Sequence, residues 1–258
     1  MTVKHENQSL VENKDQLRRV TSWIQEKLAA NIKEEVTLRV ELRIGNIYPK
    51  GSKEILDLDE TNSRIYSRKK VRYFDADIGE DHSDYLSALF DVGRHGECER
   101  YGTVDTVYHN QLGITIITDH TDDNQTPGET CLTKKKVGRL FIYNPNEEFD
   151  FEISITRIID RNKKQRRFTK RCGRFMFKRE KERLVWRDYE KAHMFKLTFV
   201  DVVFSQTSQS KKNEFEVELG LKGILPDIKD QANYQFYKSP IQAFFKEAHR
   251  INEAISME

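Results

Sequence analysis

The feature that most restricts the fold of this chain is a charged residue at every second position of three separate segments. The positions are Arg39, Glu41 and Arg43 in the first segment, Arg179, Lys181 and Arg183 in the second, and Glu214, Glu216 and Glu218 in the third. In the first and third segments, apolar residues fill the positions between them. A period of two is typical of β-strands, whose successive side chains point to opposite faces of a sheet. The chain is therefore predicted to contain strands with one charged face.

The rest of the sequence predicts a mainly β fold with helices at both ends (α+β). Strands are expected at residues 36–48, 103–108, 113–119, 138–143, 149–158, 174–186, 194–204 and 214–221. A helix is expected at residues 15–30, a short one capped by Ser83, and a last one that begins at Ser239 and Pro240. Residues 1–12 are expected to be a disordered tail and residues 13–258 a single domain.

The distribution of charged residues along the chain indicates more about possible ligands than the net charge does. The formal net charge of the 258 residues is only +2, which by itself does not indicate a nucleic-acid-binding protein. Residues 157–187, however, contain fourteen Lys or Arg and three acidic residues. Such a block favours phosphate binding, although a solvated basic loop explains its part at residues 161–170 equally well.

Cysteine usage and hydropathy predict a chain that is neither secreted nor inserted in a membrane. The three cysteines, Cys98, Cys131 and Cys172, are far apart, which indicates reduced thiols rather than a zinc site or disulfides. The first residues lack the apolar stretch of a secretory signal, and no segment approaches 18 consecutive apolar residues.

The charged strand faces have two interpretations. In a half-exposed sheet they are simply the side that faces solvent. Like charges two residues apart on a strand lie about 7 Å apart and repel each other. A row of carboxylates is therefore favoured by a divalent cation or a basic neighbour, and a row of cations by phosphates. If both rows point into one barrel, the arrangement suits metal-assisted hydrolysis of a phosphoanhydride.

Several segments resemble, in order, the motifs of one known family. The motifs and the matching residues are ExExKxG (39–45), RFxSGV (71–78), TxDxxY (103–108), KxRIxDLxI (134–142), DxRIS (149–154), RxKxR (179–183), IDLTxV (195–200) and ExExE (216–220). The chain resembles the fungal and protozoal RNA 5′-triphosphatases of mRNA capping, which belong to the triphosphate tunnel metalloenzymes.

This resemblance implies a closed antiparallel eight-stranded tunnel and a metal-dependent hydrolase that removes the γ-phosphate of nascent RNA during cap formation. It implies Mg²⁺ or Mn²⁺ as the cofactor, held by Glu41, Glu216 and Glu218. It assigns catalysis to these three glutamates together with Arg179, Lys181 and Arg183. It assigns substrate binding to Arg43, Lys134 and Lys136.

The sequence departs from the family's motifs at several positions. These positions are Arg39, Thr115, Glu152, Ile158, Lys196 and Gly220. Arg39 stands where the first metal-binding glutamate is expected. Ile158, or Arg157 if the match is shifted by one residue, stands where a glutamate would orient the attacking water, and Glu152 or Glu214 are the possible replacements. Glu214 also substitutes for the glutamate missing at Gly220 if the register is shifted.

These departures leave two alternatives open. One is a tunnel-fold protein without catalysis that binds triphosphate or RNA ends, or acts as a subunit of a transcription or capping assembly. The other is general RNA binding through residues 161–174, with a steep salt dependence. An ion pair between Arg39 and the glutamates would favour the first alternative over hydrolysis.

The expected ligand is triphosphate-ended RNA or a nucleotide. An RNA guanylyltransferase and a second copy of the chain are possible protein partners, and no membrane is expected. The predicted location is the nucleus, or the cytoplasm for a viral or parasite-specific protein.

Overall fold

The computed structural model describes residues 3–31, 37–51, 64–91, 97–108, 114–119, 129–160, 175–188, 193–204, 212–221 and 238–256. The helices in these ranges are α1 (Val3–Asn31), α2 (Glu80–Asp91) and α4 (Lys238–Ile255). The strands are β1 (Thr37–Pro49), β2 (Arg64–Ser67), β3 (Val71–Asp75), β4 (Glu97–Tyr108), β5 (Ile114–Asp119), β6 (Glu129–Tyr143), β7 (Asp150–Asp160), β8 (Phe175–Asp188), β9 (His193–Phe204) and β10 (Lys212–Leu221). None of the described helices has the length and apolar character needed to cross a membrane.

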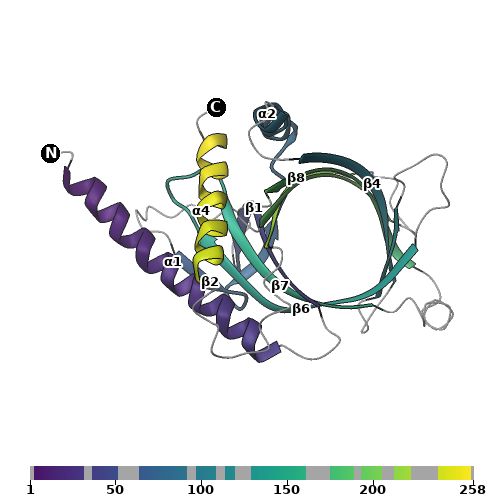
Figure 1. Ribbon diagram of the computed structural model, residues 1–258, viewed down its shortest axis with the longest axis horizontal. Coiled ribbons are helices and arrows are strands. Elements are labelled where there is room, and N and C mark those ends of the chain that lie inside the picture. Colours follow the sequence, from purple (N-terminus) through teal and green to yellow (C-terminus); the bar gives the residue numbers. More distant parts are fainter. Residues whose placement is uncertain are drawn as a thin grey trace.

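Eight of the strands follow one another in a ring. The antiparallel pairings run from β1 through β7, β6, β5, β4, β8 and β9 to β10, and β10 also pairs with β1. Each of these strands therefore has a hydrogen-bonded neighbour on both sides. Figure 1 shows the ring in end view, with α1 and α4 beside its wall of β1, β6 and β7.

The helices cover the outer face of this wall, because that face is apolar. Leu42 of β1, Ile153 of β7 and Leu219 of β10 are fully buried in one cluster with residues of α1 and α4. Burying apolar side chains between helices and sheet is the main stabilising contribution in such a layer. The strand face that points away from the helices is left for charged residues.

The predicted mainly β class and all eight predicted strands are confirmed, but the sheet formed by the described residues has ten strands rather than eight, because β2 and β3 are added outside the ring. β2 pairs with the end of β6, and β3 pairs with the end of β1. Both are short, with four and five residues. A segment of that length shows too few alternations to be recognised from its sequence.

Two helix boundaries also differ from those predicted. α1 begins at Val3, within the segment expected to be a disordered tail, and this segment contains no Gly or Pro that would interrupt a helix. Ser83 is not a cap, because α2 already begins at Glu80, directly after Gly79, whose φ is +83°. The Ser83 backbone N–H donates to the Gly79 carbonyl at 3.3 Å, inside the helix.

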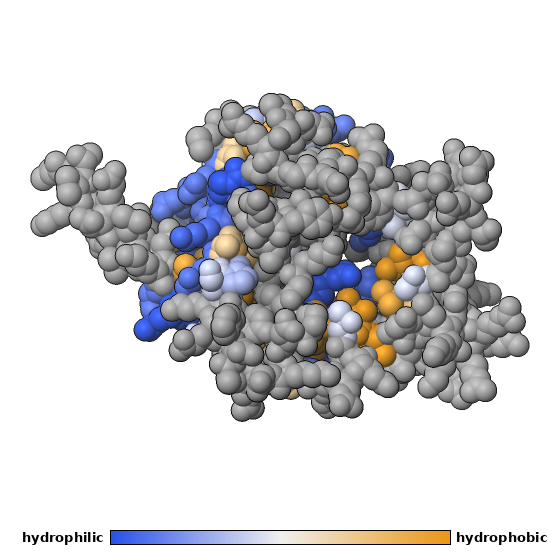
Figure 2. Space-filling model, in the orientation of Figure 1, coloured by the Kyte–Doolittle hydropathy of each residue, from blue (hydrophilic) through white to orange (hydrophobic). Residues whose placement is uncertain are grey.

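The space-filling view in the same orientation shows a hollow within the ring (Figure 2). Hydrophilic and hydrophobic residues lie side by side on the part of its wall that is visible. The visible part of the inner face is therefore of mixed character, whereas the outer face under the helices is apolar.

Candidate functional site

The inner face of the ring can be followed from strand to strand by register. Arg43 on β1 lies opposite Glu152 on β7 and opposite Glu218 on β10. Residues directly opposite each other in an antiparallel pair point to the same face of the sheet. The charged alternating positions predicted from the sequence thus share the face that points away from α1 and α4.

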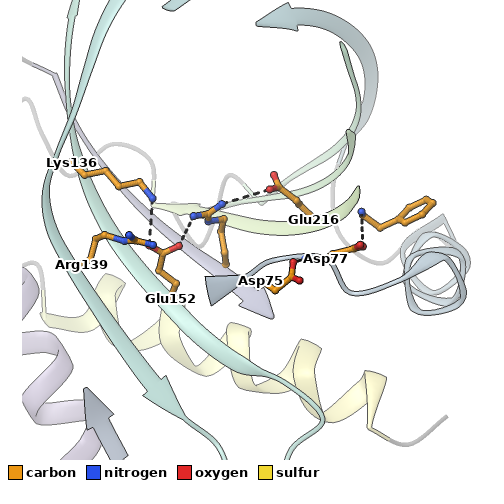
Figure 3. A network of polar contacts seen from close by, with 8 residues as sticks. Asp75, Asp77, Lys136, Arg139, Glu152 and Glu216 are labelled. Carbon is orange, nitrogen blue, oxygen red and sulfur yellow. Dashed lines mark hydrogen bonds and ion pairs between the residues drawn. The ribbon is translucent and has the colours of Figure 1, made fainter. Parts of the chain in front are cut away.

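Glu152 is the centre of an ion-pair cluster on this face. Its carboxylate accepts hydrogen bonds from Arg43 and Arg139, and from the Nζ of Lys136 at 3.3 Å. The Glu152 side chain is fully buried, whereas that of Lys136 is 40% exposed. Figure 3 shows Lys136 and Arg139 pointing toward this one carboxylate. The cluster carries more positive than negative charge.

The cluster keeps Glu152 ionised. Burial by itself would raise the pKa of the Glu152 carboxyl. The charges of Arg43, Lys136 and Arg139, with the hydrogen bond from Arg139, outweigh burial and lower this pKa to about 2. A carboxylate with so low a pKa is a weak base. The predicted use of Glu152 to orient and activate a water is therefore not supported by its surroundings.

Arg43 joins the cluster to the glutamates of β10. Its Nη1 lies 3.6 Å from Oε1 of Glu216, while its Nη2 binds Glu152. Burial alone would lower the pKa of the Arg43 guanidinium, but Glu152, Glu216 and Glu218 raise it. Arg43 therefore stays charged. Its side chain connects Glu152 of β7 with Glu216 of β10, the two strands on either side of β1.

Arg139 was missed in the sequence because strand alternation breaks just before it. Lys136 pairs with Thr156 of β7 and Gly138 with Ile155, so Val137 is an extra residue in β6. This β-bulge places Arg139, three residues after Lys136, on the same face as Lys136. The guanidinium of Arg139 also lies 5.0 Å from the ring centre of Phe141. A glycine within a strand pattern, here Gly138, is the signal that could have indicated the bulge.

The turn before β7 fixes the position of Glu152. Asp150, two residues earlier, accepts hydrogen bonds from the backbone N–H of Ile47 at 3.1 Å and of Asn144 at 2.9 Å. Burial raises the Asp150 pKa to about 6, although these hydrogen bonds lower it. On the helix side, Asn252 of α4 accepts a hydrogen bond from the Phe149 N–H at 3.2 Å. Glu152 therefore projects from a strand end that is held on both sides.

The second row of cations lies on β8, across the ring from β7. Four strand-to-strand steps separate β7 from β8 in either direction around the ring. Arg183 is linked by register through Thr198 to Glu216, so it lies on the inner face together with Lys181. Arg183 donates a hydrogen bond to the hydroxyl of Thr103 on β4. The structure describes Arg179 only as a backbone position in β8, opposite Asp105 of β4.

Lys134 and Ile158 face each other on β6 and β7. Arg157 is opposite Lys135 and so lies on the other face. The register thus assigns the inner position to Ile158, which is buried and carries no carboxylate. The side chains of Thr115, Lys196 and Glu214 are not described, and residues 161–174 lie outside the described residues.

The predicted metal ligands are not arranged as a metal site. Oε1 of Glu41 lies 3.3 Å from Nη1 of Arg39, so the ion pair expected of a tunnel without catalysis is present at this one glutamate. Glu216 is engaged by Arg43. Glu41 is opposite Gly220, which adds no carboxylate. Three carboxylates suit Mg²⁺ or Mn²⁺ chemically. Within the described ranges, however, no three His, Cys, Asp or Glu side chains come together as a metal site requires. No reaction step is therefore assigned to a metal.

Residues 75–79, the end of β3 and its connection to α2, position Glu216. The carboxylate of Asp77 accepts hydrogen bonds from the Phe215 N–H at 3.0 Å and from the Gly79 N–H at 3.2 Å. The Ile78 N–H donates to the Phe215 carbonyl at 2.9 Å. Figure 3 shows Asp77 beside β10, next to Glu216. This connection passes so close to Gly45 that a Cβ there would lie 2.0 Å from the Asp75 carbonyl oxygen.

Comparison with known proteins adds a family and a fold. The family model described as "mRNA capping enzyme, beta chain" matches residues 11–257. The fold is similar to that of the S. pombe Pct1 RNA triphosphatase, with a TM-score of 0.72, 18% identity and 92% of each chain covered. The Pct1 structure in complex with the Spt5 CTD gives a TM-score of 0.73 with the same identity and coverage. No curated protein sequence matches significantly.

Proposed function

Because the chain belongs to the family of mRNA capping enzyme beta chains, we propose that it is an RNA 5′-triphosphatase that removes the γ-phosphate of nascent RNA in cap formation. In this proposal the ring of eight strands is a tunnel that receives the triphosphate end. The observation that carries the proposal is the cluster in which Arg43, Lys136 and Arg139 converge on the buried Glu152 inside the ring. Glu152 holds these cations in place before the substrate arrives.

The two walls of the ring give the triphosphate a clamp. Arg43, Lys136 and Arg139 project from β1 and β6, and Lys181 and Arg183 from β8 on the far side. Arginine binds phosphate oxygens through paired N–H donors, and lysine binds them as a compact charge. Lys136 is the most exposed of the three cations around Glu152, so we propose that it meets the substrate first.

The chemistry of phosphoryl transfer needs little more than position and charge. Negative charge develops on the oxygens of the γ-phosphate, and fixed cations stabilise it without having to reorganise. Arg43 is already fixed by Glu152 and Glu216. Dependence on Mg²⁺ or Mn²⁺ stays a prediction, as do nuclear location, docking on a guanylyltransferase and pairing with a second copy.

The direct test is release of labelled γ-phosphate from triphosphate-ended RNA in EDTA, in Mg²⁺ and in Mn²⁺. We expect release by the wild-type protein and strongly reduced release by Lys136→Ala. The matched control is Lys135→Ala, which removes an exposed cation from the opposite face of the same strand. We expect this control to behave as the wild type.

Two results would contradict the proposal. One is no release above background under any metal condition, from folded protein that still binds triphosphate-ended RNA. That result would assign the chain to the alternative of a tunnel that binds without hydrolysis. The other is equal loss in Lys135→Ala and Lys136→Ala, which would remove the role of the inner face.

A further inference from the structure

A pair of stacked tyrosines lies outside the ring, where β3 pairs with the end of β1. Tyr48 and Tyr73 are register partners on these two strands. Their ring centres are 4.2 Å apart and their planes differ by 7°. Tyr73 is 44% exposed, which is unusual for a large aromatic side chain, and Tyr48 is half-buried. The pair therefore presents an aromatic ring to solvent.

Exposed cations adjoin this aromatic pair. They are Lys50, Arg68, Lys69, Lys70 and Arg72. No acidic residue occurs between positions 64 and 74 of the sequence. Within the part of the chain that the structure describes, none of these five cations forms an ion pair with a carboxylate. The described residues thus provide no carboxylate partner for these five charges.

Hydrogen bonds fix the backbone of the turn that carries these cations. The Val71 N–H donates to the Arg68 carbonyl at 3.3 Å, which closes the turn between β2 and β3. The Lys50 N–H donates to the Lys70 carbonyl at 3.0 Å, which ties this turn to the end of β1. The cations therefore project from a turn whose backbone is hydrogen-bonded, and not from an extended peptide.

We propose that these residues form a second RNA-binding surface, which holds the single-stranded part of the RNA behind its 5′ end. We call it the Tyr48–Tyr73 surface; it consists of the two tyrosines and the five cations named above. Bases stack on exposed aromatic rings whatever their identity, and neighbouring cations bind the phosphates between them. This inference rests on the proposed function in one respect: the proposed function identifies the bound polymer as RNA.

The position on β1 is compatible with one RNA chain reaching both sites. Five positions of β1 separate Arg43 in the cluster from Tyr48 on the surface, which at the rise of a strand is about 16 Å. Because this spacing is odd, the two side chains point to opposite faces of β1, so an RNA chain bound at both sites would pass around the end of this strand. The proposed tunnel would read the triphosphate, and the Tyr48–Tyr73 surface would add affinity for the chain without reading its sequence.

The test uses single-stranded RNA with a 5′-hydroxyl end, so that no triphosphate contributes. Binding is measured by fluorescence anisotropy over a range of salt concentrations. We expect Tyr73→Ala to weaken binding about tenfold and Tyr73→Phe, which keeps the ring, to change it little. Arg72→Gln should reduce the slope of log affinity against log salt by about one phosphate contact. Arg19→Ala, an exposed arginine on α1, is the control and should leave binding unchanged.

The proposal is overturned if Tyr73→Ala and Arg72→Gln, both folded by circular dichroism, bind the RNA as the wild type does. A protein ligand for the basic turn would give that same result. Failure of the proposed function is a separate outcome. If the wild-type protein releases no γ-phosphate, but Tyr73→Ala weakens its binding to 5′-hydroxyl RNA, the proposed RNA-binding surface is supported and the proposed hydrolysis is contradicted.

Discussion

Arg43 of β1 and Glu152 of β7 lie directly opposite each other in register and form an ion pair inside the ring. The Glu152 side chain is fully buried, and that of Arg43 is 23% exposed. One guanidinium thus neutralises a buried carboxylate and also reaches Glu216 on the next strand. Removing Arg43 leaves the buried Glu152 with only Lys136 and Arg139, and removing Glu152 leaves three cations without their shared carboxylate. Either change is more costly than losing a surface ion pair.

Two substitutions of Arg43 are expected to show separately how its positive charge and its two-sided hydrogen bonding contribute to γ-phosphate release. Arg43→Ala should lower γ-phosphate release about 100-fold, because a fixed donor to the developing charge is lost. Arg43→Lys keeps the charge but cannot bind Glu152 and Glu216 through two nitrogens, so we expect only partial recovery. Single-turnover release measures both variants. Full activity of Arg43→Lys would show that charge alone matters at this position.

Glu152 should make stability depend on acid pH. Its pKa of about 2 in the folded protein lies below the ordinary value of 4.5. Between these pH values the unfolded chain binds more protons, so stability is complete above about pH 4.5 and is lost as pH falls towards 2. The expected loss is roughly 3 kcal/mol. Urea unfolding at several pH values measures it, and Glu152→Gln should lose this part of the pH dependence. An unchanged acid profile in Glu152→Gln would refute the assignment.

Arg39 is expected to oppose metal binding. Its Nη1 lies 3.3 Å from the Glu41 carboxylate, where a divalent cation would otherwise be attracted. Arg39→Glu should therefore increase Mn²⁺ affinity, as measured by calorimetry in the absence of substrate. Arg39→Gln removes the cation without adding a carboxylate and should give a smaller increase. Equal Mn²⁺ binding by the wild type and both variants would mean that Arg39 does not compete with metal.

Gly45 is expected to tolerate no side chain. A Cβ at this position would lie 2.0 Å from the Asp75 carbonyl oxygen and 2.8 Å from the Ala76 Cα. Because both atoms belong to the backbone, residues 75–79 would have to move in Gly45→Ala. We expect a destabilisation of ~1–3 kcal/mol and weaker γ-phosphate release, since Asp77 would lose its hold on β10 beside Glu216. Thermal unfolding measures the first effect. A melting temperature equal to that of the wild type would contradict this account.

The sequence was sufficient to predict the strands that carry the inner face. Alternation along β1 and β10 reflects the pleat of a strand, which is a local property, and Arg43 and Glu216 accordingly meet inside the ring. The sequence could not predict whether Arg39 forms an ion pair with Glu41, because this depends on side-chain conformation. Glu152 was recognised as a departure but not as the centre of a cluster. Its three partners come from two other strands, β1 and β6, so its role depends on the register of β7 with both of its neighbours.

The extra residue at Val137 has a consequence for the comparison of sequences. The two halves of β6 follow different phases of the same two-residue repeat, with Lys134 and Lys136 in one phase and Arg139 in the other. An alignment without gaps would therefore match inner positions of this strand with outer positions of a relative that lacks the bulge. A deletion of Val137 would remove the extra residue and leave Lys136 and Arg139 opposite the same residues of β7.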